Sequence, residues 1–341
     1  MDSTPTAPTS GSRVVMDPAT TTRVLTPVSR LTSFVTPTAD VFVIAHMGIA
    51  RVDVGAWRLA VDGLVDRLLT LTHDELRALP SRTVTSFIEC YGNPVEPDVP
   101  TRRVGNVVWR GVALRDLLLR AGVSPRATHV WLVGADSGTF ANIHSDRYIK
   151  DLPLATVLER DDVLVAWEMN DAPLTAEHGF PARAVVPGFF GTNSVKWLTR
   201  VTLADARPES LFTTKLYNRK VQRDGVSAME PVREADVHSV IVSPCDGDTV
   251  VRGGDVAMAG WAWSAWPVAR VEVSVDGGAH WREAPVEPRH EGHAWQRFTL
   301  DWRAETAGEH RIQCRATDAR GRTQPPRHGR NRIHEVTITV E

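Results

Sequence analysis

The C-terminal part of the chain carries short apolar runs separated by turn residues, and this texture constrains the fold more than any other feature. In "VARVEVSVDGG", Val268, Val271, Val273 and Val275 mostly alternate with polar residues before Asp-Gly-Gly ends the run. This pattern predicts a strand that enters a tight hairpin. "SVIVSP", "DVAMAGWAWS", "AWQRFTLDW", "EHRIQCRATDARG" and "EVTITVE" have the same texture. Six or seven such strands within about 100 residues predict an immunoglobulin-like β-sandwich.

The chain before residue 225 mixes helices and strands. "TLTHDELRAL" (Thr70–Leu79) has an early acidic turn and is followed by Pro80, which predicts a short helix. "VALRDLLLRAG" (Val112–Gly122) has apolar positions at helical spacing and a glycine stop. "HVWLVGAD", "DVLVAWEMN" and "ARAVVPG" predict strands. Because no steady βαβ rhythm links these elements, we expect an α+β domain rather than a doubly wound sheet.

These textures divide the 341 residues into three parts, and the length is comfortable for two domains. Residues 1–30 are rich in Ser, Thr, Pro and Gly and predict a disordered N-terminal arm, because they bury little apolar area. We assign residues 31–225 to the α+β domain and residues 226–341 to the sandwich. The polar segment 213–237 has no clear periodicity and is predicted to be a linker that lies over the first domain.

Composition excludes several classes of function. An apolar content of 42% and a charged content of 23% are typical of a folded soluble protein. The net charge of −2 argues against a nucleic-acid partner, and no apolar segment is long enough to cross a membrane. The N-terminus lacks the basic start and apolar core of a secretory signal, and Cys90, Cys245 and Cys314 are too few for a disulfide framework. We therefore expect a cytoplasmic location.

Cys90 ends the apolar run of "SFIECYGNPVEPD". A buried free cysteine usually behaves as a small hydrophobic residue, and we accept that interpretation for Cys245 and Cys314. After Cys90, however, Gly92 allows the backbone to approach a bulky group, and Asn93 offers both a donor and an acceptor. From the residues alone, two interpretations of Cys90 stay open: a core thiol, or a ligand at the edge of a site.

Histidines and loops offer further candidates. His46 follows the run "VFVIA", while His178 and Arg183 share the loop "EHGFPAR". A lone histidine is more often a structural hydrogen-bonding group, but a histidine and an arginine on one loop could grip an anion. The sequence has no HExxH, CxxC or histidine pair at ligand spacing, which disfavours zinc. "VVPGFFGTNSVKW" is not a phosphate loop, and no G-x-S-x-G supports a serine nucleophile.

Taken in order, these motifs resemble the sulfite oxidase family of molybdenum-cofactor enzymes. The resemblance is carried by "FVIAHMG", "ECYGN", "GNVVWRGVALRDLLLRAGV", "GAD", the block 163–201, "GWAWSAWPVARVEVSVDGGAHW" and "RATDARGRTQP". It implies an α+β molybdopterin-binding catalytic domain followed by an immunoglobulin-like dimerisation domain, and hence a homodimer. We expect one or two tryptophans of "GWAWSAW" (Gly260–Trp266) to fill the sandwich core and the remaining aromatic face to form the dimer interface.

The resemblance also assigns roles to residues. In this family a molybdopterin carries the metal through two dithiolene sulfurs, and a protein cysteine supplies a third, which makes Cys90 the metal ligand. Arg183 and Lys196 would meet the phosphate of the cofactor, Asp136 would accept pterin N–H bonds, and Tyr217 would point its hydroxyl at the metal's oxo groups. The cofactor-binding residues implied in this way are His46, Cys90, Asp136, His178, Arg183, Ser194, Val195 and Lys196. Asp136 as a turn residue and Tyr217 as a linker residue are the alternatives.

The chain departs from the family pattern where a small oxyanion would bind. Typical members read arginine-asparagine-histidine where this chain has "IAH" from Ile44, and they carry arginines where it has Pro94 and Val95. Such arginines hold the substrate anion. The sequence offers three possible substitutes, Arg51, Arg102 and Arg103.

The resemblance therefore predicts oxygen-atom transfer to sulfite or a related sulfur oxyanion. The altered arginine positions keep two alternatives open: a different substrate, such as nitrate, an S-oxide or a natural-product intermediate, and an inactive relative that serves in binding or assembly. The sequence has no CxxCH haem-attachment motif and no haem domain before the catalytic part. We therefore expect the electrons to pass to an external acceptor, a cytochrome or oxygen.

Overall fold

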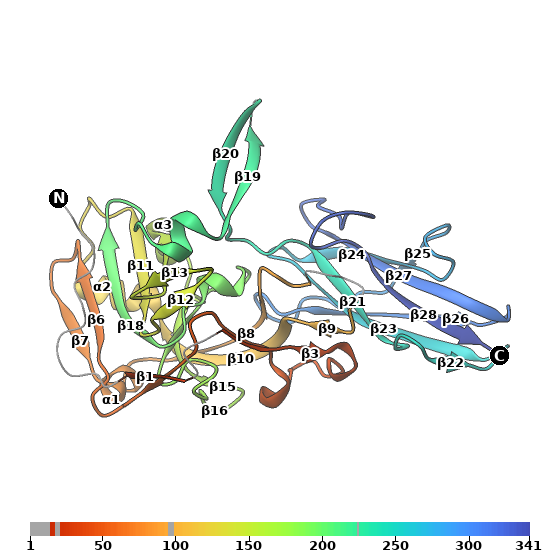
Figure 1. Cartoon of the computed structure of the whole chain (residues 1–341), viewed down its shortest axis with the longest axis horizontal. Coiled ribbons are helices and arrows are strands. Elements are labelled where there is room, and N and C mark those ends of the chain that lie inside the picture. Colours follow the sequence, from red (N-terminus) through yellow and green to blue (C-terminus); the bar gives the residue numbers. More distant parts are fainter. Residues whose placement is uncertain (1–13, 18–20, 95–98, 224) are drawn as a thin grey trace. The chain divides into compact units, whose positions relative to one another are not determined.

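The computed structural model describes residues 14–17, 21–94, 99–223 and 225–341, and these form two compact units (Figure 1). The first unit comprises the residues up to Val24, Val43–Val84 and Val108–Arg233, and the second comprises Leu25–Phe42, Thr85–Val107 and Glu234–Glu341. Strands β8 (Arg82–Glu89) and β10 (Val104–Ala113) each continue from one unit into the other. Both units are thus discontinuous in sequence, whereas the boundaries after residues 30 and 225 stay a prediction.

Two five-stranded sheets contain most strands of the first unit. One has the order β14 (Ile149–Pro153), β11 (His129–Gly134), β18 (Leu198–Ala204), β6 (Leu59–Gly63) and β7 (Leu69–Leu71). The other has the order β16 (Ala172–Pro173), β15 (Leu164–Met169), β10 and β8, and β17 (Arg183–Val185) also pairs with β15. The β18–β6 pair is parallel, whereas β11 pairs antiparallel with both of its neighbours. The predicted α+β domain is confirmed.

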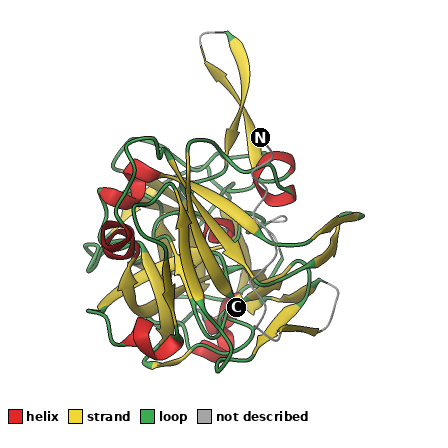
Figure 2. Cartoon of the chain, turned by 90° about the vertical axis from the view of Figure 1, so that its left-hand side faces the viewer, coloured by secondary structure: helices red, strands yellow, loops and turns green. Residues whose placement is uncertain are grey.

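Helices in the first unit are short (Figure 2): α1 (His73–Arg77), α2 (Leu114–Ala121) and α3 (Leu154–Leu158), with the 3-10 turn η3 (Gly191–Asn193) and the π-helical turn η4 (Leu211–Lys215). Thr72 caps α1 through a reciprocal bond with Glu75. The helix is shorter than predicted because Thr70 and Leu71 belong to β7. No helix in the described part of the chain is long and apolar enough to span a membrane.

Part of the N-terminal arm forms strands where the sequence predicted disorder. The pairs are β1 (Val14–Asp17) with β5 (Ile49–Val52), β2 (Thr22–Val24) with β4 (Val43–Ala45), and β3 (Thr26–Pro27) with β9 (Thr101–Arg102). The 3-10 turns η1 (Val28–Arg30) and η2 (Thr38–Asp40) follow. Backbone groups of the arm bond to strands much later in the chain, a partnership that composition does not reveal. Residues 1–13 and 18–20 lie outside the described residues.

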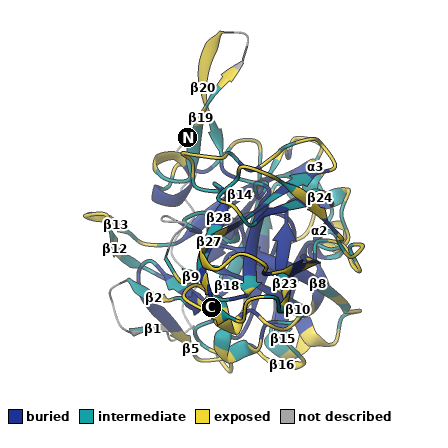
Figure 3. Cartoon of the chain, turned by 90° about the vertical axis from the view of Figure 1, so that its right-hand side faces the viewer, coloured by how far each residue is buried: buried dark blue, intermediate teal, exposed yellow. Residues whose placement is uncertain are grey.

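The predicted linker also contains structure. Strands β19 (Asn218–Arg223) and β20 (Val226–Pro231) pair antiparallel in a hairpin that stands clear of the rest of the first unit (Figure 3). The dipeptide Asp224-Gly225 is a hairpin signal that the linker interpretation missed. A second small hairpin joins β12 (Gly138–Phe140) and β13 (Ile143–Ser145). The linker therefore does not lie flat over the first domain as predicted.

The second unit contains the predicted two-sheet sandwich. One sheet has the order β21 (His238–Ser243), β23 (Asp255–Trp263), β26 (Gln296–Arg303). The other has the order β22 (Thr249–Val250), β28 (His334–Val340), β27 (Gly308–Asp318), β24 (Val268–Ser274), β25 (Arg282–Ala284). Met258, Phe298, Val271 and Ile312 meet in the shared core. β24 and β25 form the predicted hairpin, but residues 275–281 connect them, so the loop is longer than a tight turn.

The tryptophans of β23 lie outside that core, contrary to expectation. Val256, Met258 and Ala262 of β23 face the core, so alternation turns Trp261 and Trp263 to the opposite face. Both are buried there because the segments Leu25–Phe42 and Thr85–Val107 of the same unit cover this face. The indole N–H of Trp261, for example, donates to the carbonyl of Leu31 at 2.5 Å.

Candidate functional site

Three loops of the first unit bring most of the predicted site residues together. Asp136 follows β11, and the segment Ser194–Lys196 leads into β18, its neighbour in the sheet. The backbone N–H of Ala135 accordingly donates to the carbonyl of Trp197 at 2.9 Å. The loop that carries His178 leads into β17, whose Ala184 N–H donates to the carbonyl of Val195 at 2.8 Å.

Arg183 ties two of these loops together. Its Nη1 donates to the carbonyl of His178 at 3.0 Å and its Nη2 to the carbonyl of Ser194 at 3.1 Å, while the guanidinium lies 4.8 Å from the ring centre of Trp109. The side chain is buried, and burial lowers its pKa to about 9. No carboxylate of the described residues pairs with it. Arg183 is thus a buried cation that organises the loops and has no carboxylate partner in the described part of the chain.

Asp136 and Lys196 form the charged centre of this cluster. Burial raises the pKa of Asp136 and lowers that of Lys196, and the opposite charge of each partner limits both shifts. Asp136 Oδ1 is buried and has no hydrogen-bond partner among the described residues. A Cβ at Gly134 would lie 2.5 Å from that oxygen and 2.9 Å from the Lys196 carbonyl, so only glycine permits this approach. The described residues thus leave a buried acceptor unbonded near the charge of Lys196.

Tyr217 and His46 meet beside the same cluster. The Tyr217 hydroxyl lies 2.6 Å from His46 Nε2, and the rings of Phe140 and Phe212 lie 4.6 Å and 5.4 Å from the imidazole. Burial, and then the charge of Lys196, lowers the pKa of His46 to about 4. His46 is therefore neutral at pH 7, and it shares one hydrogen bond with the Tyr217 hydroxyl. Tyr217 is half-buried and packs against the core of the first unit.

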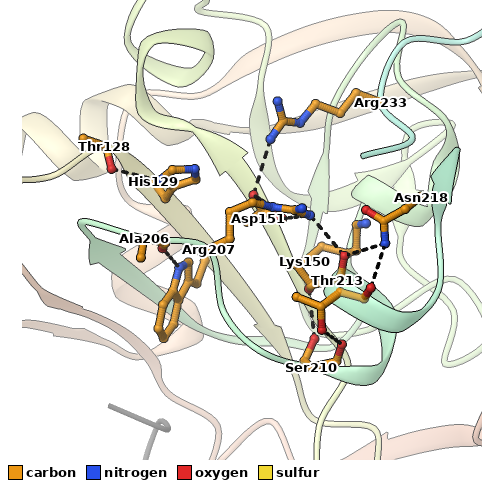
Figure 4. A network of polar contacts seen from close by, with 12 residues as sticks. Thr128, His129, Lys150, Asp151, Ala206, Arg207, Ser210, Thr213, Asn218 and Arg233 are labelled. Atoms are coloured by element: carbon orange, nitrogen blue, oxygen red, sulfur yellow. Dashed lines mark hydrogen bonds and ion pairs between the residues drawn. The ribbon is translucent and has the colours of Figure 1, made fainter. Parts of the chain in front are cut away.

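A buried ionic network lies on β14 in the same unit (Figure 4). Asp151 accepts a bidentate bond from Arg207 at 2.9 Å and 3.0 Å and lies 3.4 Å from Arg233. Burial alone would raise the pKa of Asp151, but the bonds and charges of these arginines, with Lys150, hold it below its usual value. The signal in the sequence was a Lys-Asp pair inside an otherwise apolar strand, and it was missed.

This network holds the π-helical turn that precedes Tyr217. Lys150 Nζ donates to the carbonyl of Phe212 at 3.1 Å, and Arg207 Nη2 donates to the carbonyl of Thr213 at 3.1 Å. Lys150 Nζ also lies 5.6 Å from the ring centre of Tyr217. A π-helical turn leaves some carbonyls without regular hydrogen-bond partners. Here Lys150 of β14 and Arg207 of the loop after β18 donate to such carbonyls.

Cys90 belongs to the second unit and is half-buried there. Its backbone N–H donates to the carbonyl of Arg103, and its carbonyl accepts from the N–H of Asn93, both at 2.9 Å. Burial raises the pKa of the thiol, while the backbone N–H of Gly92 and the guanidinium of Arg103 act in the opposite direction. The three cysteines are free, and Cys314 is in the sandwich core, where burial raises its pKa to about 12. Arg103 both bonds the thiol of Cys90 and acts on it by its charge, whereas Arg102 acts on Cys314 by its charge only.

The proposed arginine substitutes have different surroundings. Arg102 is buried and donates to the carbonyls of Val99 and Thr101, so its guanidinium stabilises the local backbone. The charge of Arg51 acts on the carboxylate of Glu177, the residue before His178. Arg103 remains, beside Cys90.

Arg23 is a further cation that sequence reasoning missed. In the antiparallel β2–β4 pair, Arg23 stands directly across from Ile44, and its charge acts on His46. Of the positions where family members carry arginine, Pro94 is buried, whereas Val95 lies outside the described residues. Arg23 and Arg103 thus stand at other sequence positions than the arginines of the family pattern.

Comparisons with known proteins assign two domains to the chain. Residues 46–212 match the oxidoreductase molybdopterin binding domain, and residues 229–337 match the Mo-co oxidoreductase dimerisation domain. The sulfite oxidase of Gallus gallus is 32% identical over 86% of this chain and 68% of its own length. The mitochondrial sulfite oxidase of Rattus norvegicus is 33% identical over 86% of this chain but 58% of its own length. This chain thus spans somewhat more than half of some curated relatives.

Two further matches have names other than sulfite oxidase. An NADH nitrate reductase of Oryza sativa subsp. japonica is 31% identical over 88% of this chain and 37% of its own length. The crystal structure of the sulfane dehydrogenase SoxCD from Paracoccus pantotrophus superposes with a TM-score of 0.79 and 29% identity, covering 95% of this chain and 90% of that one. The fold, with its cofactor-binding and dimerisation domains, defines a molybdenum-cofactor oxidoreductase. The chain belongs to the sulfite oxidase family.

The cluster in the first unit fits the molybdopterin that this family carries. The unpartnered Asp136 oxygen matches the need of pterin N–H groups for an acceptor. The buried guanidinium of Arg183 and the ammonium of Lys196 match a phosphate, because both are cations that no described carboxylate bonds directly.

Proposed function

We propose that this chain transfers an oxygen atom to sulfite or a related sulfur oxyanion and passes the electrons to an external acceptor. The observation that carries the proposal is the cluster of Arg183, Lys196 and the unpartnered Asp136 oxygen, which has the donors and acceptor that molybdopterin needs. When bound, the molybdenum group supplies the oxygen-atom transfer and takes up the electron pair. The protein binds, orients and shields that group.

The roles of individual residues follow from their surroundings. Asp136 accepts the pterin N–H bonds, and Arg183 and Lys196 balance the phosphate charge. Cys90 ligates the metal as a thiolate, a form that the neighbouring Arg103 favours. The remaining contacts to the cofactor come from His46, His178, Ser194 and Val195. Tyr217, aligned by its bond to His46, orients the substrate or a water molecule.

A small sulfur anion suits the cations that remain. Arg103 lies beside Cys90, and Arg23 stands across from Ile44, so some positive charge is kept despite the altered positions. Relatives named sulfite oxidase and a structure named sulfane dehydrogenase support a sulfur substrate. The second candidate is a less anionic compound that carries sulfane sulfur, which Ile44 and Pro94 favour because a doubly charged anion needs more cationic donors.

Replacing the metal ligand tests the proposal. Cys90→Ser is expected to keep the fold, measured by circular dichroism, and to lose molybdenum-dependent turnover, because a hydroxyl replaces the soft thiolate. Cys245→Ser is the matched control, since Cys245 is half-buried in a turn and is expected to leave turnover unchanged. Full turnover in Cys90→Ser would show that another residue holds the metal.

The substrate is tested by restoring a charge. Ile44→Arg is expected to lower the KM for sulfite by roughly tenfold, because one charge-assisted bond is worth about 1.5 kcal/mol or more. Ile44→Gln is the control that adds a polar group without charge. An unchanged KM for sulfite together with turnover of dimethyl trisulfide, a neutral compound that carries sulfane sulfur, would favour the second candidate. Both assays use an artificial dye as electron acceptor.

We propose further that the chain forms a homodimer and resides in the cytoplasm. The match of residues 229–337 to a dimerisation domain supports the homodimer, and three free cysteines suit a reducing compartment. Sedimentation equilibrium that gives twice the mass of one chain is the expected result. A cytochrome or oxygen would accept the electrons.

A further inference from the structure

The loop that carries Cys90 is held on both sides by one arginine from the far end of the chain. Arg330 lies between β27 and β28 of the second unit. Its Nη1 donates to the carbonyl of Asn93 at 2.6 Å and lies 3.4 Å from Glu89 Oε1. These two partners stand immediately before Cys90 and three residues after it. Arg330 thereby connects the two ends of the segment from Glu89 to Asn93, which contains Cys90.

Arg330 is itself fixed in place. Its Nη2 donates to Asp236 Oδ2 at 2.7 Å, and its guanidinium lies 5.3 Å from the ring centre of Tyr91. The side chain is mostly buried, with 17% of its surface exposed. Both nitrogens of the fork and one face of the guanidinium are therefore in use, which leaves this side chain few alternative conformations.

The partners of Arg330 are locked to one another and to Cys90. Asn93 Nδ2 donates to Glu89 Oε1 at 3.1 Å, and the indole N–H of Trp263 donates to Glu89 Oε2 at 3.0 Å. Asn93 also donates its backbone N–H to the Cys90 carbonyl at 2.9 Å. Glu89 and Asn93 are fully buried, so their bonds are not exchanged for water.

We propose that Arg330 is a positioning residue for Cys90: its bridge between Glu89 and Asn93 sets the direction of the thiol before the metal arrives. This inference rests on the proposed function, in which Cys90 ligates molybdenum. It gives the sandwich unit a role in the metal site besides dimerisation. Groups that orient a metal ligand contribute strongly to metal affinity because the ligand then needs no reordering when the metal binds.

The test uses the full chain in a Cys245→Ser background, which leaves Cys90 as the accessible thiol because Cys314 is buried. Arg330→Lys keeps the charge but loses the planar fork, and Arg330→Met loses both. Arg303→Met is the matched control, because Arg303 pairs with Asp255 at 3.5 Å on the exposed surface of the same unit. If Arg330→Lys and Arg330→Met have the same effect, the planar fork of the guanidinium is responsible and not its charge.

Two measurements are made on each variant. The first is the rate at which iodoacetamide alkylates Cys90 in protein from cells that cannot make the cofactor, which is expected to rise roughly tenfold in both Arg330 variants, because the loop opens more often. The second is the molybdenum content of protein from cells that make the cofactor. Metal affinity is expected to fall roughly 10–100-fold in both variants. Arg303→Met is expected to match the parent in both.

Parent-like alkylation and molybdenum content in both Arg330 variants would overturn the inference. A loss of stability alone, with Cys90 alkylated at the parent rate, would also overturn it, because it would make Arg330 merely structural. If Arg330→Met does not fold by circular dichroism, Arg330→Lys decides. If Cys90→Ser keeps full turnover, the proposed function fails by a separate measurement, while faster alkylation in the Arg330 variants would still show that Arg330 positions the thiol.

Discussion

Among single residues, His46 has the clearest signature in solution. Burial, Lys196 and Arg23 lower its pKa from 6.5 to about 4, so between these values the unfolded chain binds a proton that the folded chain does not. Stability is therefore present above pH 6.5 and is lost as the pH falls toward 4. The loss from His46 is expected to reach about 2 kcal/mol at pH 5, since one pKa unit corresponds to about 1.4 kcal/mol.

Urea unfolding at pH 7 and pH 5 measures this loss. The His46→Gln variant is expected to lose less stability than the parent between the two pH values, whatever its stability at pH 7. His144→Gln, at an exposed position in β13, is the control and is expected to lose as much as the parent. Equal losses in the parent and His46→Gln would contradict the assignment of this pH dependence to His46.

The residues that the sequence predicted and those that it missed differ in kind. His178, Arg183 and Lys196 stand in one continuous block, 163–201, whose order along the chain carries the family pattern. Arg23 and Arg330 reach their partners through strand pairing and folding between distant segments, which one sequence does not encode. The predicted site therefore contains the residues of local motifs and lacks the residues that support them from elsewhere.

At the scale of elements, the network on β14 determines where the turn η4 lies. Asp151→Asn is expected to cost about 3–5 kcal/mol of unfolding free energy, because it leaves Lys150, Arg207 and Arg233 as buried or half-buried cations without their anion. The carbonyls of η4 would lose well-placed donors at the same time. Urea unfolding measures the first effect, and amide exchange of η4 measures the second.

Asp205→Asn is the matched control for that change. Asp205 pairs with Arg126 at 3.1 Å, and both side chains are exposed, so the expected cost is below about 1 kcal/mol. Similar costs for the two substitutions would mean that the β14 network does not stabilise the fold more than a surface ion pair.

Elements with strong local periodicity were predicted well. The helix α2, whose buried face is Leu114, Leu117, Leu118 and Ala121, and the strands β11 and β15 were all found in the sequence. The hairpin β19–β20 was missed because its polar composition masked its alternation, and β1 was missed because its partner β5 is remote. Local patterns identify the strands with strong periodicity, whereas strands such as β1 form because of pairing with a distant segment.

At the scale of the whole molecule, the sandwich depends on segments that precede it by more than a hundred residues. Trp261, Trp263 and Trp295 donate their indole N–H groups to Leu31, Glu89 and Phe34 respectively. These acceptors all belong to the second unit, although the predicted boundary at residue 226 separates them from the sandwich. Removing them would uncover on the order of a few hundred Å² of aromatic surface, since a buried tryptophan contributes about 150–250 Å² and Trp261 and Trp295 still cover one another's stacked faces.

A fragment of residues 226–341 is therefore expected to aggregate or to bind the dye ANS, because exposed apolar patches above a few hundred Å² favour association. The full chain is expected to do neither. In the same fragment, the double substitution Trp261→Thr with Trp295→Gln is expected to reduce ANS binding. A reduction would show that the dye binds the uncovered outer tryptophans and not a misfolded sandwich core. A monomeric fragment that unfolds cooperatively and binds no ANS would mean that the sandwich is complete without Leu25–Phe42 and Thr85–Val107, and that its outer tryptophans tolerate water.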